Sequence, residues 1–288
     1  MTPRLTPAKI TMTPAAASLR TIEVALDPST ESPLDLTVFI SCYNEKAYII
    51  DTIDTVRAAL AEIGRFSYEI IIIDDGSRDC SPELIEDYIR THTEECILFR
   101  RNNVNLGWAQ NYLDAAFLGK GKYYRVVCGD NSEPKETMVS VFGEIGTVDI
   151  LVPYYATSEG RGAYRLLVSR VYTTFVNIVS GFRLHYYNDL AVHLRHNVMR
   201  WHSNTRGFGF QADILCLVLE QGFTYKQIAV KTIERKKGAS TAITFKNLLS
   251  VTHTLFDILI RRIANSVHDR GKQRHAAPLE KPDRVDSR

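Results

Sequence analysis

The chain has 288 residues, 45% of them hydrophobic, and a formal net charge of +2, so it can bury one large core in one main domain. No two of its five cysteines form a CxxC pair, and their number is odd. Both facts argue against a disulfide framework and a zinc site. The cysteines are Cys42, Cys80, Cys96, Cys128 and Cys216. A reducing, cytosolic location is therefore expected.

The two ends of the chain differ in composition from the middle. Residues 1–33 are rich in Thr, Pro, Ala and Ser without a sustained period, and residues 268–288 are rich in charged residues and Pro. These patterns predict a disordered N-terminal arm and a disordered C-terminal tail around one domain at residues 34–267. No run reaches the roughly 18 apolar residues of a spanning helix, so we expect a chain that does not cross a membrane.

Strand and helix patterns alternate from Leu36 onward. Ser81 followed by Pro82 predicts a helix start, with Ser81 as the capping hydroxyl. Apolar residues at helical spacing predict another helix between Ile49 and Ile63. The order predicts an α/β fold with a mostly parallel sheet flanked by helices. The expected strands are Leu36–Ser41, Ile70–Ile73, Cys96–Phe99 and Tyr123–Cys128.

Acidic and polar side chains follow three of these strands. Tyr43, Asn44 and Glu45 follow the first, Asp74 and Asp75 the second, and Asp130 the fourth. An open α/β sheet presents its ligand crevice at the carboxyl ends of its strands, so these sites can share one ligand. The combination suggests a nucleotide recognised by side chains and a metal-bridged diphosphate, which points to sugar transfer.

The ordered motifs resemble glycosyltransferase family 2. They are Tyr43-Asn44-Glu45, Asp74-Asp75-Gly76-Ser77, Asn105-Leu106-Gly107 and the late Arg235-Lys236-Lys237-Gly238-Ala239-Ser240. The similarity runs from about Leu36 to Arg262 and is closest to the polyprenyl-phosphate branch, which includes dolichol-phosphate mannosyltransferase. The resemblance implies a GT-A fold, the Rossmann-like fold of nucleotide-diphospho-sugar transferases, with amphipathic helices towards the C-terminus.

The first half of the expected site concerns the nucleotide. The resemblance implies that Asp75 contacts the base, while Tyr43 offers a stacking surface and Glu45 a second acceptor for base or ribose. Asp74 and Asp75 have an alternative as turn and capping residues, because Asp-Asp-Gly-Ser is rich in turn formers. The choice between a UDP-linked and a GDP-linked sugar stays open, as does the identity of the sugar.

The second half concerns the diphosphate. Gly129-Asp130-Asn131 stands where the family shows Asp-x-Asp, and Cys128 replaces the first aspartate. A thiol is a poor ligand for Mg²⁺ or Mn²⁺, so Asp130 is the main metal candidate, with Asn131 and Glu133 as helpers. The alternative is a turn before a helix that begins near Pro134.

A late basic segment is expected to close over the leaving diphosphate as a lid. Breaking the sugar–diphosphate bond develops negative charge that cations must offset. Arg235, Lys236 and Lys237 carry such cations, and Ser240 offers a hydrogen-bond donor.

Two kinds of acceptor remain open. A polyprenyl phosphate is already ionised at neutral pH, so it needs orienting cations, for which Arg161 and Arg165 are the candidates. A hydroxyl acceptor needs a base, and Asp213 is its candidate. Asp213 has an equal alternative as a capping or ion-paired residue of a helix.

Two apolar stripes lie in the basic second half of the chain. Each predicts an amphipathic helix that either covers the core or another subunit, or lies in a membrane interface. The stripes are Tyr164, Val168, Val171, Phe175, Ile178 and Phe182, and Phe245, Leu248, Leu249, Leu255, Phe256, Leu259 and Ile263.

The favoured hypothesis is an inverting enzyme that moves a hexose from a nucleotide-diphosphate sugar to a polyprenyl phosphate at the cytosolic membrane face, with peripheral membrane contact. The alternatives are a transferase acting on a hydroxyl of a polysaccharide, glycolipid or metabolite, and a non-catalytic nucleotide-sugar-binding protein, which the replacement by Cys128 motivates. No nucleic acid partner is expected.

Overall fold

The computed structural model describes residues 34–93, 96–155, 163–188, 190–201, 209–231 and 251–265. In the described residues a five-stranded sheet has the order β3-β2-β1-β4-β6, and its first four strands are parallel. These strands are β1 (Leu36–Cys42), β2 (Tyr68–Asp74), β3 (Ile97–Arg101) and β4 (Tyr123–Cys128), and the antiparallel β6 (His193–Leu194) follows β4. The expected mostly parallel α/β sheet is confirmed.

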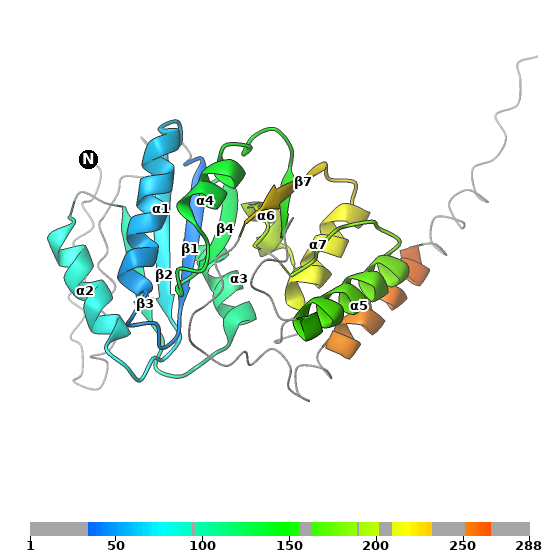
Figure 1. Ribbon diagram of the computed structural model, residues 1–288, viewed down its shortest axis with the longest axis horizontal. Helices are drawn as coiled ribbons and strands as arrows, with labels where there is room; N and C mark the ends of the chain where they lie inside the picture. The colour runs from blue at the N-terminus through cyan, green and yellow to red at the C-terminus, as the bar shows by residue number, and fades with distance from the viewer. Residues whose placement is uncertain are drawn as a thin grey trace, which may run out of the picture. The chain divides into compact units, whose positions relative to one another are not determined.

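Helices cover both faces of this sheet, because its central strands are apolar on both sides. Val38 and Ile40 of β1 pack with α1 (Ile49–Ile63) and α4 (Lys135–Phe142). Phe39 faces the other way and packs with α3 (Trp108–Leu118). Successive side chains of a strand point to opposite faces, so two separate cores result. Figure 1 shows the helices arranged around the sheet.

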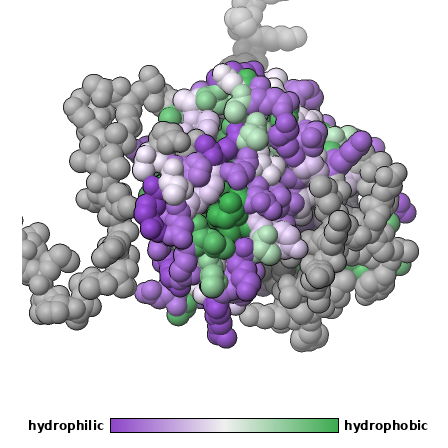
Figure 2. Space-filling view, turned by 60° about the vertical axis from the view of Figure 1, so that its left-hand side comes forward, coloured by the Kyte–Doolittle hydropathy of each residue, from purple (hydrophilic) through white to green (hydrophobic). Residues whose placement is uncertain are grey.

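The edge strand β3 is less buried than its neighbours. Its residues Ile97, Leu98 and Phe99 are half-buried. Figure 2 brings the left-hand side of Figure 1 forward and shows a small apolar area framed by hydrophilic side chains. This side of the molecule therefore presents a mainly polar surface.

The start of α2 (Ser81–Thr91) corrects one expectation. Pro82 lies in the first turn as expected, but Ser81 is already helical and makes no capping hydrogen bond. Its hydroxyl instead donates to Asp79 Oδ1 and accepts the N–H of Glu45 at 3.0 Å. Ser81 therefore joins the loop after β1 to the loop after β2. The expected helix after Pro134 is confirmed as α4.

The second part of the domain pairs β5 (Ile150–Tyr155) with β7 (Tyr225–Val230). Its helices are α5 (Ala163–Ser180), α6 (Arg195–Met199), α7 (Phe210–Glu220) and a helix at residues 251–265. Figure 1 shows α5 beside the last helix, drawn in orange. Arg262 Nη1 joins them by donating to the carbonyls of Ile178 and Val179, at 3.0 and 2.9 Å.

The apolar stripe of α5 does not cover the core where the structure describes it. Val171 is 46%, Phe175 53% and Ile178 67% exposed, whereas Thr173 and Val176 form the buried side. The core-covering alternative is therefore wrong for Val171, Phe175 and Ile178, whereas Phe182, the last residue of the predicted stripe, packs against the core. Among the described residues, the chain has no helix with the length and apolar character that crossing a membrane requires.

Candidate functional site

The loops after β1 and β2 are joined by hydrogen bonds at the carboxyl edge of the sheet. Asn44 N–H donates to Ser77 Oγ, and Arg78 N–H donates to Asn44 Oδ1, each at 2.8 Å. Asp75 N–H donates to the carbonyl of Cys42 at 2.9 Å. Asn44 has a φ of 57°, in the left-handed region that asparagine tolerates better than most residues. This arrangement holds Tyr43, which is 46% exposed, beside the Asp75 loop.

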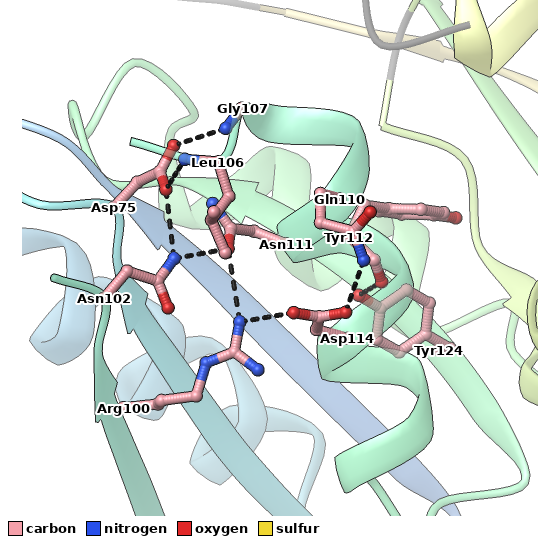
Figure 3. Close-up of polar contacts among 10 residues, drawn as sticks. All are labelled: Asp75, Arg100, Asn102, Leu106, Gly107, Gln110, Asn111, Tyr112, Asp114 and Tyr124. Carbon is pink, nitrogen blue, oxygen red and sulfur yellow. Dashed lines mark hydrogen bonds and ion pairs between the residues drawn. The ribbon is translucent and has the colours of Figure 1, made fainter. Parts of the chain in front are cut away.

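The carboxylate of Asp75 holds the loop that leads from β3 into α3 (Figure 3). Its Oδ1 accepts Asn102 Nδ2 at 3.0 Å and the N–H of Leu106 at 2.8 Å, and its Oδ2 accepts the N–H of Gly107 at 3.0 Å. Asp75 is only 6% exposed. The carboxylate therefore fixes the start of α3 at the same sheet edge.

Gly76 permits the close approach of these two loops. Its φ is 75°, and a Cβ at this position would lie 3.1 Å from the carbonyl carbon of Val104 and 3.2 Å from the nitrogen of Asn105. A side chain here would be strained both by the backbone conformation and by these contacts. The close packing of the two loops thus favours glycine at this position of the Asp-Asp-Gly-Ser motif.

A polar network behind Asp75 was not predicted from the sequence. Asn102 Nδ2 also donates to Asn111 Oδ1 at 2.8 Å, and Arg100 Nη2 donates to Asn111 Oδ1 at 3.3 Å and to Asp114 Oδ2 at 2.6 Å. Asn111 is 2% exposed. The available signal was the pair Asn111 and Asp114, three residues apart on a helix whose buried positions are otherwise apolar or aromatic.

Asp74 and Cys42 are the last residues of β2 and β1, and both are buried. Asp74 Oδ2 accepts the N–H of Ser77 at 3.0 Å, and Asp74 is fully buried. Burial, and to a smaller extent the neighbouring charge of Asp74, raises the pKa of Cys42 to about 12. Cys42 is therefore a neutral thiol at physiological pH, and Asp74 shapes the turn that carries Asp75.

Asp130 follows β4 at the same edge as Asp75. β1 lies between β2 and β4 and is parallel to both, with Ser41 opposite Cys128 in the register. Gly129 N–H donates to the carbonyl of Ser41 at 2.9 Å, and a Cβ on Gly129 would lie 2.6 Å from that oxygen. The loops that carry Tyr43, Asp75 and Asp130 thus emerge from three neighbouring strands.

The Asp130 loop is a tight turn. Asp130 Oδ1 accepts the N–H and the hydroxyl of Ser132, at 3.2 and 2.8 Å. Asn131 has a φ of 49°. The turn expected as an alternative is therefore present, and it presents oxygen donors at the sheet edge.

Glu133 is engaged elsewhere. Its carboxylate accepts Arg125 Nη2, and the side chain of Arg125 is only 1% exposed. Arg125 Nε also donates to the carbonyl of Leu190 at 3.2 Å, and its guanidinium lies over the ring of Phe142. Glu133 therefore neutralises a buried cation and ties the Asp130 loop to β4.

The Asp130 turn offers oxygen ligands of the kind that a divalent cation needs. The described ranges contain no group of three His, Cys, Asp or Glu side chains that could hold a metal. Mg²⁺ and Mn²⁺ take oxygen ligands, and Mg²⁺ in particular keeps several waters while bridging phosphates, so a single protein carboxylate suffices when a diphosphate supplies the rest. Asp130, Asn131 and Ser132 fit such a shared site.

Asp213 lies in the first turn of α7 and is 5% exposed. Its Oδ2 accepts the indole N–H of Trp201 and its Oδ1 accepts Arg261 Nη1, each at 2.8 Å. Arg261 Nε also donates to Glu220 Oε2 at 2.9 Å. Of the two roles left open for Asp213, the structure shows the ion pair.

The remaining expected site residues are not fully described. Arg161, Arg235 and Ser240 lie outside the described residues. Arg165 lies within α5, but its side chain is outside the described part of the chain. Glu45 is described at the end of the β1 loop, where its N–H is bonded to Ser81. The roles expected for these residues stay predictions.

Comparisons with known sequences agree with this architecture. Residues 37–201 match the model of glycosyl transferase family 2. A dolichyl-phosphate β-glucosyltransferase of Dictyostelium discoideum is 31% identical over 109 residues, which are 35% of this chain and 33% of that protein. An undecaprenyl-phosphate 4-deoxy-4-formamido-L-arabinose transferase of Pseudomonas aeruginosa is 25% identical over 222 residues, 75% of this chain and 64% of that protein. The chain thus spans less than two thirds of both relatives.

Solved structures show the same fold at low identity. A mannosyltransferase from Pyrobaculum calidifontis, in complex with GDP-Man and Mn²⁺, has a TM-score of 0.55 and 18% identity, covering 75% of this chain and 61% of that one. A glucosyl-3-phosphoglycerate synthase from Mycobacterium tuberculosis, in complex with UDP, has a TM-score of 0.56 and 15% identity, covering 78% and 80%. The expected GT-A fold is confirmed. Because the family match covers more than half of the residues of this chain, the chain belongs to glycosyl transferase family 2.

Proposed function

We propose that this protein is an inverting glycosyltransferase that moves a hexose from a nucleotide-diphosphate sugar to a polyprenyl phosphate at the cytosolic face of a membrane. The observation that carries the proposal is the meeting of the Tyr43, Asp75 and Asp130 loops at one edge of the sheet, since Cys42 and Ser41 of β1 are bonded to the other two loops. Ligands of open α/β sheets bind at this edge. The names of the matched relatives, which include dolichyl-phosphate and undecaprenyl-phosphate transferases, support the acceptor.

The donor is proposed to lie across this edge with its base at Tyr43 and Asp75. The exposed ring of Tyr43 offers a stacking surface, and Glu45 offers an acceptor for the ribose. Asp74 supports Asp75 through its bond to Ser77. The fixed loops keep these groups in place before the donor binds, which lowers the cost of binding.

The diphosphate is proposed to lie at the Asp130 turn. Asp130, with Asn131 and Ser132, would hold a Mg²⁺ or Mn²⁺ ion together with the diphosphate, and Glu133 serves this turn through its pair with Arg125. Such a cation supplies positive charge against the charge that develops on the leaving diphosphate. Solved neighbours of the same fold were crystallised with Mn²⁺ or Mg²⁺. Arg235 and Ser240 are proposed to add a cation and a donor from the late basic segment.

A phosphate acceptor requires no general base. Its oxygen is ionised at neutral pH, and arginines suit its orientation, for which Arg161 and Arg165 remain the proposed residues. The geometry of Asp213 supports this choice over a hydroxyl acceptor, because Asp213 is only 5% exposed and its carboxylate is paired with the guanidinium of Arg261 inside the protein. A general base must lie within hydrogen-bond reach of the hydroxyl proton that it removes.

Peripheral membrane contact is proposed through two exposed helical faces. On α5, Phe175 is 53% and Ile178 67% exposed, and on the helix at residues 251–265, Phe256 is 60% and Ile260 62% exposed. Arg170 on α5 is also exposed, which suits an anionic bilayer. A lipid-linked acceptor would then be met at the bilayer surface.

The test is a transfer assay with the full chain, vesicles that contain undecaprenyl phosphate, Mn²⁺ and a panel of labelled UDP- and GDP-sugars. The proposal predicts a labelled lipid product with at least one donor. Nucleotide binding without any product, with lipid and hydroxyl acceptors alike, would support the non-catalytic alternative that Cys128 motivates. Product formed only on hydroxyl acceptors would contradict the proposed acceptor.

A further inference from the structure

We infer that the base of the donor is uracil or thymine, which present the same single imide N–H, and that guanine is disfavoured. The inference rests on the proposed function, because it takes Asp75 as the residue that meets the base. The choice of base depends on how many further hydrogen bonds the Asp75 carboxylate can accept beyond those from the protein's own donors.

The protein fills most of the capacity of Asp75. An ionised carboxylate has about four lone-pair sites, two on each oxygen. Asn102 Nδ2 and the N–H of Leu106 both approach Oδ1, at 3.0 and 2.8 Å, and the N–H of Gly107 approaches Oδ2 at 3.0 Å. Subtracting these three donors leaves about one site, on Oδ2.

The polar network makes these donors hard to displace. Asn102 Nδ2 lies between two acceptors, Asp75 Oδ1 and Asn111 Oδ1, so its amide cannot flip without losing both bonds. Arg100 in turn donates to Asn111 Oδ1 and fixes that amide. Figure 3 shows that the carbonyl oxygen of Asn102 points away from Asp75. The side-chain donor is therefore held in one orientation.

The backbone donors are held as well. The N–H groups of Leu106 and Gly107 lie where the chain enters α3, and Gly107 has a φ of 90°, which fixes this entry to glycine-like backbone. Gly76 packs against Val104 and Asn105 of the same loop. Moving either N–H away from Asp75 would disturb the loop that Gly76 touches.

The two bases differ in the donors that they present. Uracil offers one N–H, at N3, between two carbonyl groups, which matches one remaining site. Guanine offers N1–H and the 2-amino group side by side, a pair of donors that calls for two acceptors. At Asp75 one of these would stay unpaired or displace a loop N–H, and an unpaired donor in a buried site weakens binding about tenfold or more. Cytosine and adenine each place a ring-nitrogen lone pair beside their amino group, facing the carboxylate.

The experiment is calorimetric titration of the full chain with UDP, GDP, CDP and ADP in the presence of Mn²⁺. The inference predicts that UDP binds at least about tenfold more tightly than GDP and the other two. Equal or tighter binding of GDP, CDP or ADP would overturn the inference while leaving the proposed transferase intact. Failure of all four nucleotides to bind would overturn the proposed function and the inference together.

Variants at two neighbouring positions test whether the number of donors on Asp75 determines the preference for the base. Asn102→Ala removes one donor from Asp75 Oδ1 and frees a site, so the ratio of the GDP and UDP dissociation constants is expected to fall severalfold towards one. Asn103→Ala, at the exposed neighbour, is the control and should leave the ratio unchanged. An unchanged ratio in folded Asn102→Ala would contradict the account. If Asn102→Ala does not fold, the wild-type ratio decides.

Discussion

Asp75 and Asp213 are equally buried carboxylates with opposite surroundings. Asp75 is 6% and Asp213 5% exposed. Asp75 accepts neutral N–H groups from the loop after β3, so its negative charge is retained at the sheet edge. Asp213 is paired with the guanidinium of Arg261, so its charge is neutralised inside the protein. Burial alone does not identify a binding carboxylate; the charge of its partners does.

The same contrast separates the regions around them. The Asp75 region consists of short loops joined to one another at the carboxyl ends of β1 and β2. The Asp213 region joins α7 to the helix at residues 251–265, whose other side is apolar and exposed. We therefore propose that the first region binds the ligand, whereas the second attaches a surface helix.

The largest expected effect is the loss of the Arg261 cation. Arg261→Met leaves Asp213 and Glu220 without their buried partner, and breaking such a pair costs about 3–5 kcal/mol. Urea unfolding of the full chain measures the change. The matched control is Arg262→Met, which removes exposed bonds to two backbone carbonyls and should cost about 1 kcal/mol. Equal losses in the two variants would contradict the buried-pair account.

A pH titration of stability sharpens the comparison between buried groups. Burial lowers the pKa of His193 from 6.5 to about 4, so the folded protein keeps this histidine neutral. Between these values the unfolded chain binds a proton that the folded chain does not, so stability falls as pH falls from about 6.5 to about 4. The expected loss is on the order of 3 kcal/mol.

The control for this titration is a second histidine. His193→Gln should flatten the slope of unfolding free energy against pH in this window, whereas His253→Gln, at an exposed position, should keep it. Chemical unfolding at a series of pH values gives the slope. A slope that survives in His193→Gln would show that another group causes it.

The third effect concerns the diphosphate end of the site. Asp130→Ala should lower kcat/KM for transfer by about 100-fold, because electrostatic stabilisation of the leaving group is lost. Asp51→Ala, at an exposed position of α1, should leave the rate unchanged. Rates from the lipid-product assay decide, and a rate within a few-fold of wild type in Asp130→Ala would remove Asp130 from the proposed site.

The smallest effect on turnover is expected at Asp213. Asp213→Asn removes the charge that pairs with Arg261, so the unfolding free energy should fall while turnover of folded protein stays within a few-fold. A general base contributes about 100- to 10,000-fold. Loss of that size in the transfer assay, at temperatures where circular dichroism shows folded protein, would instead favour a hydroxyl acceptor with Asp213 as its base.

Much of the sheet was predictable because its strands are local patterns. Tyr123–Cys128 was predicted with its observed bounds, and the other three parallel strands of the main sheet differ by only one or two residues at an end, whereas β5 and β7 were not predicted. The placement of Tyr43, Asp75 and Asp130 at one edge followed from the parallel order of the strands. These predictions needed no knowledge of contacts between distant residues.

Other features depend on partners far apart in sequence. The partner of Asp213 is Arg261, 48 residues later, so periodicity could not choose between a base and an ion pair. Arg125 is a buried cation on β4, and only its packing shows that Glu133 neutralises it. Ser81 likewise bonds to Glu45, 36 residues away, in place of the local cap that its sequence suggests.

The most direct test of the central claim is a crystal structure of the full chain with UDP and Mn²⁺. The account predicts the base against Tyr43 with its imide N–H on Asp75, and the diphosphate with the metal ion at Asp130. UDP bound away from this sheet edge, or bound with Asp75 and Asp130 on no common ligand, would contradict it.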